Sequence, residues 1–181
     1  SAERAKNLKQ TPAHIIGVQG RGTKPGGDFH FQHGNMGRVA GHYVGPRIFD
    51  MAGVKHEDID VTGCYDAFTY TVVLQFEAYG FCEEGEGKDY IKSGIVNLGD
   101  KRPNNTSGGH LCEAYTHGMN MVIENTRQLR GMVDDYCPDW QNGNHTYDYS
   151  EGGCRQVRDV NITMNMGWAS PATGSALILR S

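Results

Sequence analysis

Two short stretches of the sequence carry phenol, carboxyl and imidazole groups, which can exchange protons with a ligand. Tyr65 and Asp66 stand between a strand pattern and a helical pattern, and Tyr115 and His117 follow the pair Gly108–Gly109 just before a second helical pattern. The backbone N–H groups in the first turn of a helix have no partner within the helix and attract negative charge. A site for hydrogen bonding or proton transfer is therefore predicted at these two junctions.

Each of these residues also has an ordinary structural interpretation. Tyr65 at a strand end can pack on the core, and Tyr115 at a helix start can hydrogen-bond to a carbonyl. Asp66 can cap the following helix or orient a neighbouring group. The glycine pair can simply form a turn before a surface helix. The residues alone leave both interpretations open.

Hydrophobic periodicity supplies the elements that would position these groups. Apolar runs alternate with helical patterns along the chain, which is typical of an α/β fold. Pro46 is expected to kink or split the first long helix. Strands are expected at 14–18, at 159–166 and at 175–179, the last two as a hairpin around a loop at 167–174. Residues 57–61 are expected to lead into a further short strand, which residues 63–66 end. Helices are expected at 38–52, 68–79, 88–93 and 117–130.

Size and charge narrow the class of protein. A chain of 181 residues suggests one domain over 1–181. The net charge is −4 and the pI about 6.0, and no long run of Lys and Arg is visible, so nucleic acid is not expected as a partner. No apolar stretch approaches the roughly 20 residues of a membrane span. The polar start lacks Met, and we expect it to lie part-way through a longer protein.

The cysteines and histidines do not form a recognisable metal or disulfide pattern. Five cysteines with wide spacing and no C-x-x-C favour reduced thiols in a cytoplasmic protein. Cys64 and Cys112 are near the two junctions but lack a base at a recognisable spacing. His30, His33 and His42 have no H-x-x-x-H pairing, so no metal site is predicted.

The order of these pieces resembles the C-terminal half of a thiolase-superfamily protein. The matching features are Tyr65-Asp66-Ala67-Phe68 after a strand, the Gly-Gly loop, the helix GMNMVIENTRQLRG and the closing strand SALIL. The chain is most similar to the lipid-transfer-protein type, related to the thiolase part of sterol carrier protein X, and to bacterial steroid side-chain-cleaving aldolases. The resemblance implies a mixed sheet with helices on both faces, and an N-terminal half outside this chain.

Three departures from thiolases carry functional meaning. Thiolases hold Asn or His at the position of Tyr65, and the His of their Gly-His-Pro motif falls on Tyr115. Their last loop carries a catalytic Cys, whereas 167–174 reads GWASPATG. Claisen chemistry through a Cys–His pair is therefore not expected from these residues.

The steroid aldolases of this group use a pair of tyrosines, and Tyr65 and Tyr115 match their positions. The resemblance thus implies retro-aldol cleavage of a steroid 3-hydroxyacyl-CoA. His117 would help a tyrosine or the enolate oxygen, Asp66 would support the site, and Gly108–Gly109 would hold the substrate. Coenzyme A enters as the substrate thioester, with no other cofactor.

The same resemblance implies a small OB-fold partner that often carries a zinc ribbon, with any zinc belonging to the partner. A homodimer within such a heteromeric complex is expected. Two other functions remain open on the sequence: a catalytically degenerate protein that binds acyl-CoA or lipid or serves as a scaffold, and an acyltransferase that uses a Cys from an N-terminal half.

Overall fold

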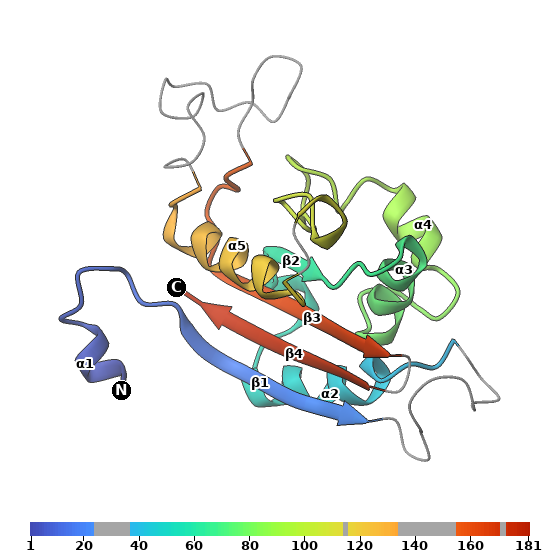
Figure 1. Ribbon diagram of the computed structural model, residues 1–181, viewed down its shortest axis with the longest axis horizontal. Coiled ribbons are helices and arrows are strands. Elements are labelled where there is room, and N and C mark those ends of the chain that lie inside the picture. The colour runs from blue at the N-terminus through green and yellow to red at the C-terminus, as the bar shows by residue number, and fades with distance from the viewer. Residues whose placement is uncertain (24–36, 114–115, 134–154, 171–172) are drawn as a thin grey trace.

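Four strands form one mixed sheet at the centre of the molecule (Figure 1). The computed structural model describes residues 1–23, 37–113, 116–133, 155–170 and 173–181. The sheet order is β1-β4-β3-β2; β4 runs antiparallel to both neighbours, and β2 runs parallel to β3. The strands are β1 (His14–Thr23), β2 (Val61–Cys64), β3 (Ile162–Ser170) and β4 (Thr173–Arg180).

Helices cover both faces of this sheet, as predicted. One helix packs on β1 and β4 from behind in Figure 1, and another crosses β2 and β3 in front. These are α2 (Gly41–Ala52) and α5 (Met119–Arg130); the others are α1 (Ala2–Ala5), α3 (Thr69–Ala78) and α4 (Gly87–Lys92), with short 3-10 turns η1 (His56–Asp58) and η2 (His110–Cys112). None of the helices in the described part of the chain has the length and apolar composition needed to cross a bilayer.

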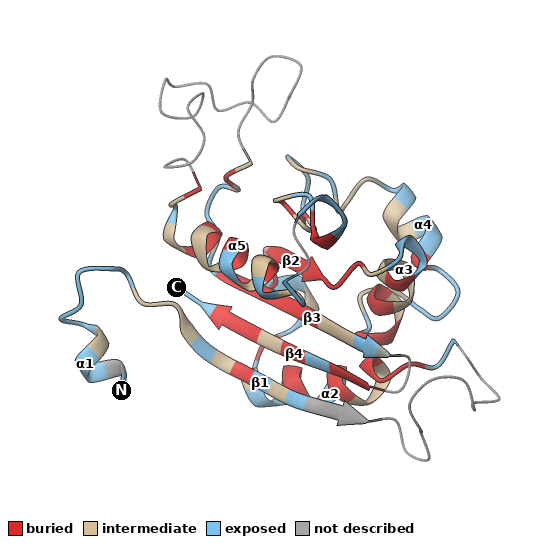
Figure 2. Ribbon diagram, in the orientation of Figure 1, coloured by how far each residue is buried: buried red, intermediate tan, exposed pale blue. Residues whose placement is uncertain are grey.

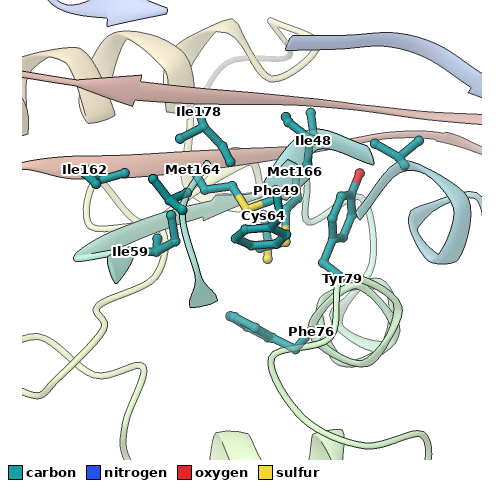
Figure 3. Close-up of a cluster of buried hydrophobic side chains, with 13 residues drawn as sticks. Ile48, Phe49, Ile59, Cys64, Phe76, Tyr79, Ile162, Met164, Met166 and Ile178 are labelled. Atoms are coloured by element: carbon teal, nitrogen blue, oxygen red, sulfur yellow. The ribbon is translucent and has the colours of Figure 1, made fainter. Parts of the chain in front are cut away.

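The main apolar core lies on the back face, between the sheet and the helices α2 and α3. Ile48 of α2, Phe76 of α3 and Ile178 of β4 are all fully shielded from solvent. Figure 3 shows these side chains gathered with Met164 and Met166 of β3. The α/β prediction is confirmed, because this strand and helix alternation buries apolar side chains between the two layers.

The front face is only partly covered. Ile178 points into the back core, so its neighbours Leu177 and Leu179 must point to the front. Their partners on β1 are Val18 and Ile15, which are 52% and 65% exposed. Figure 2 shows this part of β1 coloured largely as intermediate or exposed, and among the described residues no helix packs over it.

Three differences from the expected elements lie in the sheet and in α2. Pro46 lies inside α2 without splitting it. Strand β1 runs five residues beyond the expected end at Val18, because main-chain pairing with β4 continues through its polar part. The expected loop at 167–174 is mostly strand, since Gly167 and Trp168 remain paired with β4. Backbone pairing needs no apolar alternation, so the sequence pattern placed these strand ends too early.

Candidate active site

Tyr65 occupies the predicted junction, immediately after β2 and four residues before α3. Its backbone N–H donates to the Met166 carbonyl at 2.9 Å. Its own carbonyl accepts a hydrogen bond from Gln75 Nε2 at 2.8 Å. Both backbone groups are therefore fixed, one by the sheet and one by the helix that follows.

Asp66 connects this junction to the glycine loop. Its Oδ1 accepts the backbone N–H of His110 at 2.7 Å, and its Oδ2 lies 3.5 Å from the backbone nitrogen of Leu111. The interpretation of Asp66 as an N-cap is wrong, because α3 begins only at Thr69 and the carboxylate binds loop amides instead. Asp66 orients the loop against the strand end.

The two glycines of the loop adopt backbone conformations that favour glycine. Gly108 has φ 96° and Gly109 has φ 71°. A Cβ at Gly109 would collide with the Asp66 carboxylate and would lie 2.7 Å from Asn105 Nδ2. The pair therefore lets the loop close tightly onto Asp66. The predicted role of both glycines in holding substrate stays a prediction.

Asn105 fastens the same loop to the edge of the sheet. Its side-chain oxygen accepts the Cys64 N–H at 2.8 Å, and its Nδ2 donates to the Cys64 carbonyl at 3.0 Å. Its backbone N–H donates to Thr62 at 2.9 Å. The loop thus runs alongside β2, which brings its glycines to the strand end that carries Tyr65.

His110 is a site residue that the sequence patterns did not single out. Its imidazole stacks on the Tyr65 ring, with ring centroids 4.8 Å apart and 29° between the planes. The two residues are 6% and 7% exposed, and both imidazole nitrogens are shielded from solvent. The only signal in the sequence was its place directly after Gly108–Gly109.

The second predicted junction is described in part. Tyr115 lies outside the described residues. His117 is exposed, with φ 53°, and stands two residues before α5, which begins at Met119 and not at His117 as expected. The next residue, Gly118, lies against the Tyr65 ring, because a Cβ there would be 3.0 Å from Tyr65 Cδ2. The backbone just before α5 therefore reaches the Tyr65 ring, which belongs to the first junction.

A buried polar network anchors the glycine loop to α5. Glu124 Oε1 accepts hydrogen bonds from Thr106 Oγ1 at 2.9 Å and from Arg155 Nε at 2.9 Å. Gln128, one turn further along α5, donates to Thr106 Oγ1 at 3.0 Å. The carboxylate is almost completely buried, so its pairing with Arg155 offsets the cost of removing it from water. The loop is held by Asp66 at one point and by α5 at another.

Comparison with known proteins assigns the family. The description "Thiolase C-terminal domain-like" matches residues 29–163. The chain belongs to this thiolase family. It is 38% identical over 134 residues to a 17-hydroxy-3-oxo-4-pregnene-20-carboxyl-CoA lyase of Mycobacterium tuberculosis (strain ATCC 25618 / H37Rv). It is 39% identical over 137 residues to a steroid side-chain-cleaving aldolase of Thermomonospora curvata.

These matches cover 72% of this chain but 34% of each relative, so the chain spans about a third of their length. A solved structure, an Ltp2-ChsH2(DUF35) aldolase, superposes with a TM-score of 0.80 and 32% identity. That match covers 100% of this chain and 42% of the solved one. The prediction of a thiolase-like fold of the C-terminal type, similar to steroid aldolases, is confirmed.

Two of the described cysteines of this thiolase-family domain lie near the site, in different surroundings. Cys64 lies inside the back core, where burial, and then the charge of Asp66, raise the pKa of its thiol well above the usual value. Cys112 is exposed beside Gly108. Within the described residues, no three His, Cys, Asp or Glu side chains are grouped so as to hold a metal ion. His30 and His33 lie outside them.

Proposed function

We propose that this domain forms part of a retro-aldol carbon–carbon lyase. The substrate would be a steroid, or a similarly bulky molecule, whose side chain is a 3-hydroxyacyl-CoA. The observation that carries the proposal is the fixed, buried Tyr65 at a junction where thiolases use a different residue. The names of the two relatives, a pregnene carboxyl-CoA lyase and a steroid side-chain-cleaving aldolase, support the same substrate class.

The proposed reaction needs two proton transfers. A base removes the proton of the tertiary hydroxyl group, the C–O bond becomes a carbonyl, and the bond between the α- and β-carbons breaks. Its electron pair passes to the acyl-CoA fragment as an enolate, and an acid then protonates the α-carbon. The products are a ring ketone and a short acyl-CoA such as propionyl-CoA, and every atom of the substrate is retained in them.

Tyr65 and Tyr115 are the proposed acid and base. A free phenol ionises near pH 10, so a tyrosine base needs positive charge or N–H groups nearby. The start of α5 and the imidazole of His117 are proposed to supply them, and also to stabilise the enolate oxygen. Asp66 supports this arrangement through the loop that it holds, and Gly108–Gly109 let the backbone approach the substrate.

The remaining requirements follow from the chemistry and from the relatives. Coenzyme A is part of the substrate, and the proposed proton transfers call for no further cofactor. The superposed aldolase bears the name Ltp2-ChsH2(DUF35), which supports a DUF35 partner protein in a heteromeric complex. An OB fold with a zinc ribbon in that partner, and a homodimer of this protein within the complex, are proposed from the family resemblance. A cytoplasmic location is in keeping with the free thiols of Cys64, Cys82 and Cys112.

The direct test measures products from a steroid with a tertiary 3-hydroxyacyl-CoA side chain. The full-length protein, purified with its partner, is mixed with this substrate, and ketone and short acyl-CoA are quantified by mass spectrometry. Tyr65→Phe and Tyr115→Phe should each lower kcat by about a hundredfold or more, because each removes one proton-transfer group. Tyr70→Phe is the control, since Tyr70 is an exposed tyrosine on the neighbouring helix.

Wild-type rates in both Tyr65→Phe and Tyr115→Phe would contradict the proposed roles. Tight binding of the acyl-CoA without any product from the wild-type complex would instead favour a degenerate, acyl-CoA-binding protein. Transfer of the acyl group to free coenzyme A would favour an acyltransferase.

A further inference from the structure

We propose that His110 is a positioning residue that fixes the orientation of the Tyr65 phenol ring for proton transfer. The importance of this orientation rests on the proposed function of Tyr65. The contacts themselves are independent of it: two are made with the Tyr65 ring, and a third holds His110 in place.

The first contact is on the face of the ring. The imidazole of His110 stacks on Tyr65 with centroids 4.8 Å apart and 29° between the planes. Both rings are almost fully buried, so neither can turn without displacing its neighbours. Offset stacking of two flat rings is a favourable arrangement in itself.

The second contact is at the Cδ2–Cε2 side of the ring. Gly118 approaches so closely that a Cβ would lie 3.0 Å from Tyr65 Cδ2 and 3.5 Å from Cε2. In the sequence, His110 precedes and Gly118 follows the predicted residue Tyr115. The Tyr65 ring is therefore contacted by two residues that flank, along the chain, the residue with which it is proposed to work.

The third constraint fixes His110 itself. Its backbone N–H donates to Asp66 Oδ1 at 2.7 Å, and Asp66 is the chain neighbour of Tyr65. Gly109 allows this approach, because only a residue without Cβ fits beside the carboxylate. These contacts form a closed ring of residues. Tyr65 is bonded to Asp66 in the chain, the Asp66 carboxylate accepts the His110 N–H, and the His110 imidazole stacks on the Tyr65 ring.

Stable packing does not require the Tyr65 ring to have one fixed orientation, but proton transfer by its hydroxyl does. Catalysis by a positioned phenol depends on the hydroxyl standing within hydrogen-bond reach of the reacting atom, and a shift of about 1 Å can cost roughly a hundredfold in rate. A flat ring at position 110 is what the role requires. Phenylalanine should therefore replace His110 in this role, whereas alanine should not.

The first test measures the environment of the Tyr65 ring by ¹⁹F NMR and does not depend on enzyme activity. The full-length protein is labelled with 3-fluorotyrosine, and the ¹⁹F resonance lost in Tyr65→Phe identifies Tyr65. His110→Ala should shift and broaden this resonance, because the ring loses its stacking partner. His110→Phe should leave it narrow. Leu111→Ala is the matched control, since Leu111 is the next residue of the loop and its side chain is exposed.

The same variants are then assayed with the steroid acyl-CoA, with the folded fraction measured by circular dichroism. His110→Ala should lower kcat by about ten- to a hundredfold with KM near the wild-type value. His110→Phe should recover most of kcat, and Leu111→Ala should keep it.

Two results would overturn the proposal. One is an unchanged Tyr65 resonance in folded His110→Ala. The other is a narrow resonance in His110→Phe together with a kcat as low as that of His110→Ala, because the imidazole would then act by its chemistry and not by its shape. If Tyr65→Phe itself keeps full activity while the resonance responds as expected, the proposed function fails and the positioning by His110 stands.

Discussion

The two faces of the sheet contact their helices through different kinds of side chain. The back face meets α2 and α3 through apolar side chains such as Ile48, Phe76 and Ile178. The front face meets α5 through buried Met121 and also through directed polar contacts: Asn125 Nδ2 donates to the Met164 carbonyl at 3.2 Å and to Asn165 Oδ1 at 3.1 Å. Both interfaces are buried, but only the second joins a helix to the glycine loop, through Glu124 and Gln128.

The difference suggests separate roles for the two faces: the back face supplies most of the stability, and the front face positions the site. Apolar burial is strong but non-directional, so the back face holds the layers together without fixing a particular angle. Hydrogen bonds require particular distances and angles, so the front face fixes α5 and the glycine loop in one position. Damage to the back should therefore unfold the domain, whereas damage to the front should loosen the site first.

The largest expected effect comes from the back face. Phe76→Ala removes a fully buried ring that contacts Phe81 and Tyr90. The free energy of unfolding should fall by about 4 kcal/mol, because the lost apolar burial and the cavity left behind both cost stability. Denaturation by urea, followed by circular dichroism, measures this.

Phe68→Ala is the control for that change, since Phe68 stands at the start of the same helix but is 60% exposed. It should alter stability by less than about 0.5 kcal/mol. Equal losses in the two variants would contradict the division between the faces.

An intermediate effect is expected on the front face. Glu124→Gln removes the charge that accepts from Thr106 and Arg155. We expect a loss of about 2 kcal/mol, since hydrogen bonds to charged groups are worth roughly that much. Hydrogen exchange should accelerate most at the amides of His110 and Leu111, which belong to the anchored loop.

The informative comparison is the location of the fast exchange. If Glu124→Gln accelerated exchange evenly over β3, β4 and α2, the front network would be a general stabiliser and not an anchor for the loop. Glu113→Gln, a substitution at an exposed carboxylate outside the Glu124 network, should leave the exchange pattern unchanged.

The effect that is smallest near neutral pH grows as the pH rises, and it returns to the back face. Burial holds the pKa of the Cys64 thiol well above its usual value in the folded chain, while the thiol ionises near pH 8.5 when unfolded. Above that pH the unfolded chain has lost a proton that the folded chain keeps, so stability should decline as pH rises. Cys64 should contribute a slope of about 1.4 kcal/mol per pH unit.

Stability measured between pH 7 and 10 tests this slope. Cys64→Ala should decline less steeply than the wild type, although its stability at pH 7 is also lower. Parallel slopes in the two proteins would show that Cys64 ionises equally in both states.

The sequence predicted the strand and helix that flank Tyr65 better than it predicted the side-chain contacts of the site. The position of Tyr65 after a strand and before a helix followed from two periodicities, each local to the chain. The stacking of His110 on Tyr65 joins residues 45 positions apart (110 − 65 = 45), and no local pattern reports a contact of that kind. Asp66 was ambiguous for the same reason, because its partners belong to the distant loop.

The ends of elements were also predicted less well than their presence. Gly167 and Trp168 pair with β4 although their surroundings are rich in glycine, serine and proline. His117 lies outside α5 because its positive φ, followed by that of Gly118, cannot continue a right-handed helix. Both outcomes depend on backbone conformation, which residue type constrains only weakly at such positions.

The two edges of the sheet bear on self-association. Along β2, the segment from Pro103 to Asn105 occupies main-chain groups of Thr62 and Cys64 that an incoming strand would need. On the opposite edge, β1 has two irregularities in its register with β4, one after Ile15 and one after Gln19. Irregular edges make poor templates for another strand. A domain protected in both ways should resist edge-to-edge aggregation.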